Sequence, residues 1–145
     1  MADLRFSTKL KWSGTGRDGE GTAELSAGAV TYSAPASMGG KGVGTSPEEL
    51  LITAVASCYS GTLFGVLKKQ GLAVEHVGIR AEGEVTGYPM QAKFARLRVS
   101  PTIVGADKSK VSEYRSAAAE ARDKCFIGKT IAGNVEYEVG SVDLS

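Results

Sequence analysis

The sequence has little of the residue types that would define several common kinds of active site. His76 is the only histidine among 145 residues, and the only two cysteines, Cys58 and Cys125, lie far apart in the chain. A closed zinc site needs several clustered nitrogen or sulfur ligands, and a serine-hydrolase triad needs a histidine placed beside its partners. We therefore expect no metal site, no other cofactor and no serine-hydrolase chemistry.

The chain also lacks an excess of either charge. It has 17 Lys and Arg residues against 16 Asp and Glu residues, for a formal net charge of +1. Proteins that follow nucleic-acid phosphates carry a basic excess, so we expect no nucleic-acid partner. A hydrophobic content of 42% is ordinary for a globular protein. With no repeat or linker in the sequence, we expect one domain over residues 1–145.

The first residues lack the apolar segment of a secretory signal peptide, because residues 1–12 mix charged and apolar side chains. We therefore expect a cytoplasmic location, where thiols stay reduced. One uncharged run, residues 50–67, is near the lower length limit of a membrane-spanning helix. Its threonines, serines and glycines favour a central core helix instead, so we expect no membrane partner.

Period-two alternation and turn residues predict the strands. They cover residues 4–12, 22–33, 74–87, 92–104 and 135–139. Residues 14–21 form the first predicted turn, and residues 35–45 form a glycine-rich loop. Two helices interrupt this order of strands, which predicts an α+β fold with mostly antiparallel strand pairing.

The first predicted helix has strong signals at both ends. Ser46 is a capping residue, Pro47 suits the first helical position, and Glu49 completes a capping box. The helix should run to about Gln70 and stop at Gly71. The second helix should begin near residue 107 or 109 and end near residue 125, followed by a short turn or helical piece over residues 126–133.

Each predicted helix carries one cysteine within an apolar stripe of mainly small residues. At about 100° per residue, the neighbours of Cys58 on its helix face are Leu51, Ala54, Gly61, Thr62 and Gly65. On the second helix, the stripe consists of Val111, Tyr114, Ala118, Ala121 and Cys125. Two such helices should pack together and bring the thiols close. The residues alone leave three interpretations open: inert packing, a structural disulfide and a functional dithiol.

Three segments carry a more specific pattern. They are Gly-Arg-Asp-Gly at 16–19, the run 44–51 that leads into Ala-Ser-Cys-Tyr at 56–59, and 125–135 with its Ala-Gly-Asn-Val ending. In order and spacing they resemble the OsmC/Ohr family of osmotically inducible and organic hydroperoxide resistance proteins. The chain departs from the family pattern at Ser46, where asparagine is common, and at Phe126, where many members have proline.

The resemblance implies an OsmC-like fold, with antiparallel sheets wrapped around two central helices in an intertwined homodimer. It also implies a cysteine-based, peroxiredoxin-like peroxidase with active sites at the subunit interface. In that family the first cysteine is peroxidatic and the second resolving, which corresponds to Cys58 and Cys125, and Arg17 and Glu48 would assist. The family uses neither metal nor haem, and its better-studied hydroperoxide-resistance members take electrons from dihydrolipoyl groups.

The implied chemistry needs a thiolate at Cys58, although burial on an apolar helix face raises the pKa of a thiol. Arg17 would oppose this effect by roughly 4 kcal/mol at about 4 Å and an effective dielectric constant near 20. Glu48 would orient Arg17 through a bidentate pair. Because Glu48 precedes Cys58 by about 15 Å of helix, it would act through Arg17 or from a second subunit.

In the expected cycle, Cys58 attacks a peroxide and its sulfenic acid condenses with Cys125 to a disulfide, which an external dithiol reduces. Apolar walls from Leu51, Val55 and Tyr59 would favour an organic hydroperoxide over hydrogen peroxide. The alternatives are a non-catalytic redox sensor or small-ligand-binding protein on the same fold, and a structural dimer with inert cysteines.

Overall fold

The structure is a computed structural model that describes all residues, 1–145. It divides into two compact units, residues 1–50 and 51–145, which we describe separately. The expected α+β class is confirmed, because each unit contains a β-sheet and the second unit adds helices.

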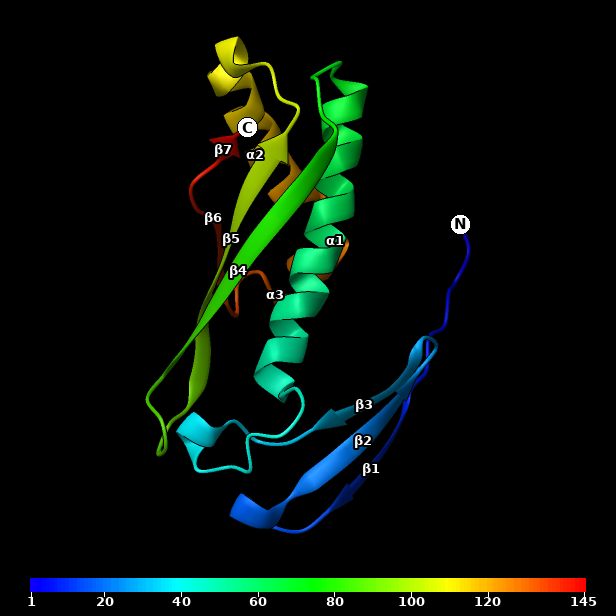
Figure 1. Cartoon of the computed structure of the whole chain (residues 1–145), viewed down its shortest axis with the longest axis vertical. Coiled ribbons are helices and arrows are strands. Elements are labelled where there is room, and N and C mark those ends of the chain that lie inside the picture. Colours follow the sequence, from blue (N-terminus) through cyan, green and yellow to red (C-terminus); the bar gives the residue numbers. More distant parts are fainter. The chain divides into compact units, whose positions relative to one another are not determined.

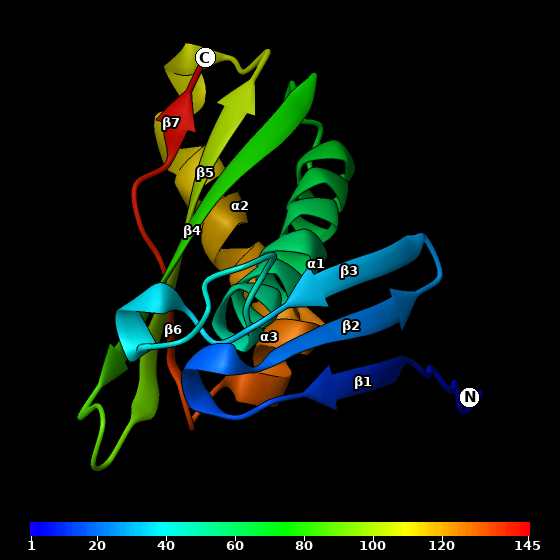
Figure 2. The ribbon, with the colours of Figure 1, turned by 60° about the horizontal axis from the view of Figure 1, so that its bottom comes forward.

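The first unit is built on a three-stranded antiparallel sheet (Figure 2). Its strands are β1 (Lys9–Ser13), β2 (Glu20–Leu25) and β3 (Gly28–Tyr32), with short 3-10 turns η1 (Gly16–Asp18) and η2 (Ala36–Met38). The Trp12 and Tyr32 rings pack with centroids 5.6 Å apart. Gly21 lies under Tyr32, where a Cβ atom would come within 2.4 Å of the ring.

Two strand predictions in this unit were wrong. The predicted strand 22–33 is two strands, β2 and β3, joined by a tight turn that ends at Gly28, whose φ of 137° suits glycine. The predicted strand 4–12 begins only at Lys9, because the register of β1 with β2 pairs Lys9 with Glu24 and extends no further toward the N-terminus. The alternation of apolar and polar residues revealed neither the turn between β2 and β3 nor the start of β1.

The second unit has a four-stranded sheet of β4 (His76–Thr86), β5 (Lys93–Val104), β6 (Glu136–Val139) and β7 (Asp143–Leu144). β4 and β5 form a long antiparallel hairpin, whereas β6 and β7 both pair with β5 in parallel. The expectation of mostly antiparallel pairing is confirmed for the chain as a whole, and the short pairings of β6 and β7 with β5 are the exceptions. The chain returns to β6 only after two helices, and such a crossover connection permits a parallel strand.

Three helices complete the second unit, and they are α1 (Pro47–Lys69), α2 (Val111–Lys124) and α3 (Phe126–Ile131). α1 begins in the first unit and follows its predicted limits closely: the Ser46 hydroxyl accepts from the Glu49 N–H at 3.2 Å, and Gly71 has a φ of +70°. The capping box is only half formed, because the Glu49 carboxylate accepts from the Thr45 hydroxyl at 2.8 Å.

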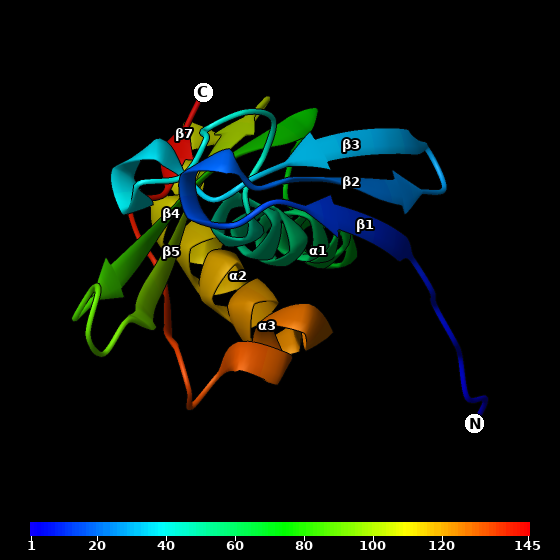
Figure 3. The ribbon, with the colours of Figure 1, turned by 90° about the horizontal axis from the view of Figure 1, so that it is seen from below.

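α1 and α2 lie on the same side of the second sheet (Figures 1 and 3), and their inner faces meet the sheet in one hydrophobic core. The Tyr59 hydroxyl on α1 donates to the Ala118 carbonyl on α2 at 3.0 Å. The predicted α2 stripe is buried except for Val111, which is 39% exposed. The fully buried core residues are Val55, Tyr59, Leu63, Leu67, Leu97, Val99, Ile103, Tyr114, Ala117, Ala118, Ala121 and Cys125.

α1 is the one helix long and apolar enough to cross a membrane by length and composition, with a mean hydropathy of 1.8. The same test is passed by core helices of globular domains. Val55, Tyr59 and Leu63 on α1 have no exposed surface and form the centre of the core. The inner face of α1 therefore belongs to the core, as expected, although only 28% of its apolar window is buried within the chain.

Candidate functional site

The structure brings the two cysteines together, as the predicted packing of their helices required. Cys58 lies in the middle of α1, and Cys125 lies at the junction of α2 and α3. Their side chains are close enough to interact with each other, and both are free thiols. The buried Cys125 sulfur also lies 3.9 Å from the Val55 carbonyl oxygen on α1. Residues far apart in sequence thus form one dithiol site.

The surroundings of Cys58 favour its thiolate. Burial raises the pKa of this thiol, but donors around the sulfur outweigh burial and lower the pKa below its ordinary value. The groups that lower it are the Cys125 thiol, the Ile127 and Phe126 backbone N–H groups and the nearby Thr62 side chain. Hydrogen bonds to a charged acceptor are stronger than neutral ones, so they stabilise the thiolate form.

The surroundings of Cys125 have the opposite effect. Burial raises the pKa of this thiol, and the hydrogen bond and charge of Cys58 raise it further. The Gly128 backbone N–H and the Tyr137 hydroxyl oppose this rise without reversing it. The two thiols are therefore unequal: the surroundings favour the thiolate form at Cys58 and the protonated form at Cys125.

The backbone donors come from the first turn of α3. N–H groups in the first turn of a helix have no acceptor within that helix. Cys125 is extended, with φ −65° and ψ 107°, so α2 stops there and α3 begins at once. The break directs the free N–H groups of Phe126 and Ile127 toward the Cys58 sulfur.

Sequence reasoning missed these backbone donors and Tyr137, and it placed Thr62 beside Cys58 on the helix face without giving its hydroxyl a role. A backbone N–H has no residue type of its own, so no motif identifies it. The available signal was positional: Thr62 follows Cys58 by one helical turn, and its hydroxyl donates to the Cys58 carbonyl at 2.9 Å. The two backbone donors lower the Cys58 pKa in the way that the sequence analysis expected of Arg17, whose own role stays a prediction.

Arg17 and Glu48 both belong to the first unit. Arg17 is exposed in the η1 turn, and Glu48 lies in the first turn of α1. No ion pair joins them within the chain, so the predicted bidentate pair is not formed there. The Glu48 Oε1 atom is buried and has no hydrogen-bond partner. The roles of both residues stay predictions.

The three predicted substrate-wall residues differ in burial. Leu51 is partly exposed, whereas Val55 and Tyr59 have no exposed surface. Val55 supplies the carbonyl beside Cys125, and Tyr59 anchors α1 to α2 through its hydroxyl. Within the chain Val55 and Tyr59 are therefore core residues, and contact with a substrate stays a prediction for all three.

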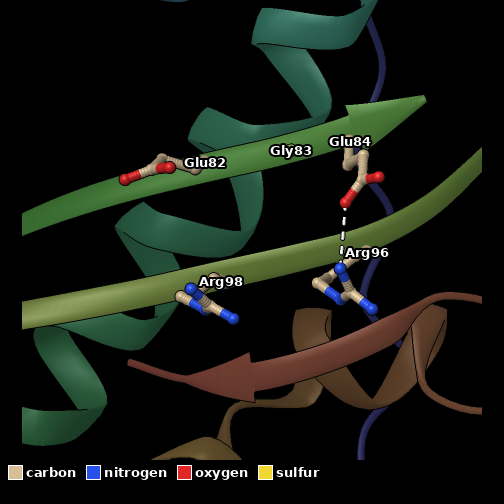
Figure 4. Close-up of a pocket in the computed structure, with 5 residues that line it drawn as sticks. All are labelled: Glu82, Gly83, Glu84, Arg96 and Arg98. Carbon is tan, nitrogen blue, oxygen red and sulfur yellow. Dashed lines mark hydrogen bonds and ion pairs between the residues drawn. The ribbon is translucent and has the colours of Figure 1, made fainter. Parts of the chain in front are cut away.

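A second polar cluster lies on the β4–β5 hairpin, where Glu82, Glu84, Arg96 and Arg98 line a shallow hollow (Figure 4). Arg96 bonds Glu84 at 3.0 Å, and Arg98 contacts a carboxylate of β6 at 2.6 Å. Since the arginines are already paired with acidic residues, the hollow offers no free cation to an anionic ligand. We interpret it as a cross-strand ladder that stabilises the sheet.

Comparison with known proteins agrees with this geometry. The model of the OsmC-like protein family matches residues 39–140. The protein YmaD of Bacillus subtilis (strain 168) is 32% identical over 142 residues, which cover 96% of this chain and 94% of YmaD.

Solved structures extend the likeness over nearly the whole chain. The crystal structure of an organic hydroperoxide resistance protein OsmC from Legionella pneumophila is 25% identical and has a TM-score of 0.75, with 97% of this chain and 99% of that chain covered. The organic hydroperoxide resistance protein OhrB of Bacillus subtilis is 22% identical with a TM-score of 0.67, covering 97% and 98%. The chain belongs to the OsmC-like protein family, and its fold is the OsmC-like fold.

Proposed function

We propose that this protein is a thiol-dependent peroxidase that reduces organic hydroperoxides to alcohols. The observation that supports this function best is the unequal pair of thiols, in which hydrogen bonds lower the pKa of Cys58 and burial raises that of Cys125. A thiolate is the nucleophilic form of cysteine. Cys58 is therefore the peroxidatic cysteine and Cys125 the resolving one.

The proposed cycle balances in three steps. The Cys58 thiolate attacks the outer peroxide oxygen, the O–O bond breaks, and the alkoxide leaves and takes a proton to become the alcohol. The sulfur is oxidised by two electrons to sulfenic acid. Cys125 then attacks that sulfur to form the Cys58–Cys125 disulfide and water. A dithiol reductant, for which a dihydrolipoyl group is suitable, restores both thiols by exchange and is itself oxidised.

Arg17 and Glu48 are proposed to complete the site. The buried Oε1 atom of Glu48 has no partner, and a buried carboxylate oxygen without one is unfavourable. A guanidinium from Arg17 would satisfy it and add a positive charge near the thiolate. Supplied by the same chain or by a second subunit, this pair would act on Cys58 by electrostatic stabilisation.

A homodimer is the proposed working form. The outer face of α1 leaves apolar side chains in solvent, with Leu50 37% and Phe64 36% exposed. On the same helix, Gly61 and Gly65 have open space where a Cβ would stand. A second copy of α1 packed there would cover these apolar side chains. The exposed apolar surface therefore supports the expected intertwined dimer. We place this dimer in the cytoplasm, where dithiol reductants are available.

The test is consumption of cumene hydroperoxide with dihydrolipoate as reductant, followed in the wild type, Cys58→Ser and Cys125→Ser. We expect turnover in the wild type and none in Cys58→Ser, because serine cannot form the sulfenate. Ser116→Ala, on the exposed side of α2, is the matched control and should turn over at the wild-type rate. Hydrogen peroxide in place of cumene hydroperoxide should be consumed more slowly, if Leu51 and its apolar neighbours contact the substrate.

The alternative function is a redox sensor or small-ligand-binding protein. It predicts a wild type that forms the Cys58–Cys125 disulfide once with peroxide and does not turn over with any dithiol. Mass spectrometry of the oxidised protein distinguishes this outcome from an inert pair, which would form no disulfide. Absence of peroxide turnover in the wild type would therefore refute the peroxidase.

A further inference from the structure

Three tyrosines are fully or almost fully buried in the core of the second unit, and they differ in what their hydroxyls bond. The Tyr59 hydroxyl donates to the Ala118 carbonyl at 3.0 Å. The Tyr114 hydroxyl donates to the Ala73 carbonyl at 2.6 Å. The Tyr137 hydroxyl is buried and has no hydrogen-bond partner. Buried hydroxyls normally have a partner, so the exception at Tyr137 needs an explanation.

The position of Tyr137 on β6 brings it to the dithiol. Side chains alternate along the strand, so Glu136 and Glu138 carry the outer charges while Tyr137 points into the core and is only 3% exposed. Its ring covers Gly128 in α3, where a Cβ would lie 2.3 Å from the ring. Gly128 is in the turn that starts at Cys125, and the Tyr137 hydroxyl is close enough to interact with the Cys125 side chain.

Arg122 holds Tyr137 from the other side. Its Nε donates to the Tyr137 carbonyl at 2.7 Å, and its guanidinium carbon lies 5.5 Å from the ring centroid. A cation over a phenol ring makes the hydroxyl a better donor, and Arg122 opposes the rise that burial causes in the Tyr137 pKa. The hydroxyl is thus a fixed, protonated donor without a carbonyl acceptor.

We propose that Tyr137 is the hydrogen-bond donor to the Cys125 thiolate, both when Cys125 attacks the oxidised Cys58 and when the disulfide is reduced. This inference rests on the proposed function for its physiological setting. The Gly128 N–H is the other donor to the same sulfur. The proposal explains why the Tyr137 hydroxyl has no acceptor: its acceptor is the Cys125 thiolate, which forms only during the reaction.

The hydrogen bond from Tyr137 to Cys125 is needed at two steps, the attack by Cys125 and the reduction of the disulfide. Cys125 must lose its proton to attack, and in the fully buried core only a donor can stabilise the resulting charge. The thiolate then forms the S–S bond while hydroxide leaves the Cys58 sulfur and combines with the released proton as water. On reduction, the attacking thiolate of the dithiol takes the Cys58 sulfur and Cys125 leaves as a thiolate, again facing Tyr137. The hydroxyl keeps its own proton throughout.

The test isolates the step in which Cys125 attacks. Reduced protein is mixed with oxidised glutathione, which forms a mixed disulfide on Cys58 and releases one glutathione. Cys125 then attacks that disulfide and releases the second glutathione. Mass spectrometry of acid-quenched samples follows both species over a range of pH. For Tyr137→Phe we expect the rate at which Cys125 closes the disulfide to rise with pH around a midpoint about one pH unit higher than in the wild type. Below that midpoint, closure should be about tenfold slower. Formation of the mixed disulfide on Cys58 should be unchanged.

Tyr114→Phe is the matched control, because it removes another buried hydroxyl from the same core. It loses its bonds to Ala73 and Asp107 and should be less stable, yet close the disulfide at the wild-type rate. Equal closure rates and midpoints in Tyr137→Phe and the wild type would overturn the inference. Should Tyr137→Phe not fold, Gly128→Ala, whose new Cβ displaces the ring, must slow closure instead.

A parallel assay with cumene hydroperoxide separates this inference from the proposed function. If the wild type consumes no peroxide while glutathione-driven closure depends on Tyr137, the peroxidase fails and the role of Tyr137 holds. If peroxide is consumed and closure in Tyr137→Phe is normal, the peroxidase stands and the role of Tyr137 is wrong.

Discussion

Replacing Phe126 by proline removes one hydrogen-bond donor to Cys58 and leaves the rest of the site in place. The Phe126 side chain is 68% exposed, so little packing is lost. Phe126 is the first residue of α3, a position where proline is well tolerated. Cys125 before it is already extended, as a residue before proline prefers. What changes is the backbone N–H that contributes to lowering the Cys58 pKa.

The size of the effect follows from the number and order of the donors. A hydrogen bond to a charged group contributes about 1.5–3 kcal/mol, and the Phe126 N–H is the weakest of the four donors at Cys58. We take the lower end, which corresponds to a rise of about one pKa unit. At pH values below the Cys58 pKa, the thiolate fraction and the alkylation rate then fall about tenfold.

The assay is the rate of Cys58 alkylation by iodoacetamide between pH 5 and 9, with the modified peptide identified by mass spectrometry. Phe126→Ala is the matched control, since it removes the side chain and keeps the N–H. We expect Phe126→Ala to follow the wild-type profile and Phe126→Pro to move to higher pH. Superimposed profiles for the two variants would refute the role of the backbone donors.

Other properties of the structure give further predictions. Burial raises the pKa of Tyr59 and of Tyr137, so the folded state keeps protons that unfolded tyrosines lose near pH 10. Stability should therefore fall as the pH rises above about 10, seen as a lower urea midpoint at pH 11 than at pH 9. Leu63→Ala, at a site with no exposure, should lose about 2–5 kcal/mol in urea unfolding. Leu4→Ala, at a site that is 76% exposed, should lose much less. Arg96→Ala breaks the outer ladder and should lower the melting temperature while Cys58 alkylation stays unchanged.

Local signals predicted most of the helices and strands. The Ser46 cap and the stop at Gly71 placed α1 to within a residue or two, because capping and left-handed glycine are local requirements. The stripe on α2 and the small residues around Cys58 correctly indicated that the two helices pack together. The same local rules missed the turn before Gly28 and the strand β7 (Asp143–Leu144). A strand of two residues is too short to show an alternating pattern.

Strand direction was beyond local rules. β6 lies parallel to β5 because α2 and α3 carry the chain back across the sheet before it re-enters. The alternation of Val135, Tyr137 and Val139 predicted a strand but said nothing about its partner. That partner decides where Tyr137 points, and so decides that a hydroxyl from the last part of the chain lies beside Cys125.

The sequence by itself determined the two thiols, the helices that carry them and the family motifs that surround them. These features depend on residue type and short-range spacing, which a linear sequence records directly. Only the tertiary structure decided which of the two thiols has the lower pKa. That difference depends on the burial of Cys125 and on the break at Cys125 that frees two backbone N–H groups. Each of these is a property of neighbours in space, and the electrostatic energy of a sulfur depends on distance in space rather than on distance along the chain.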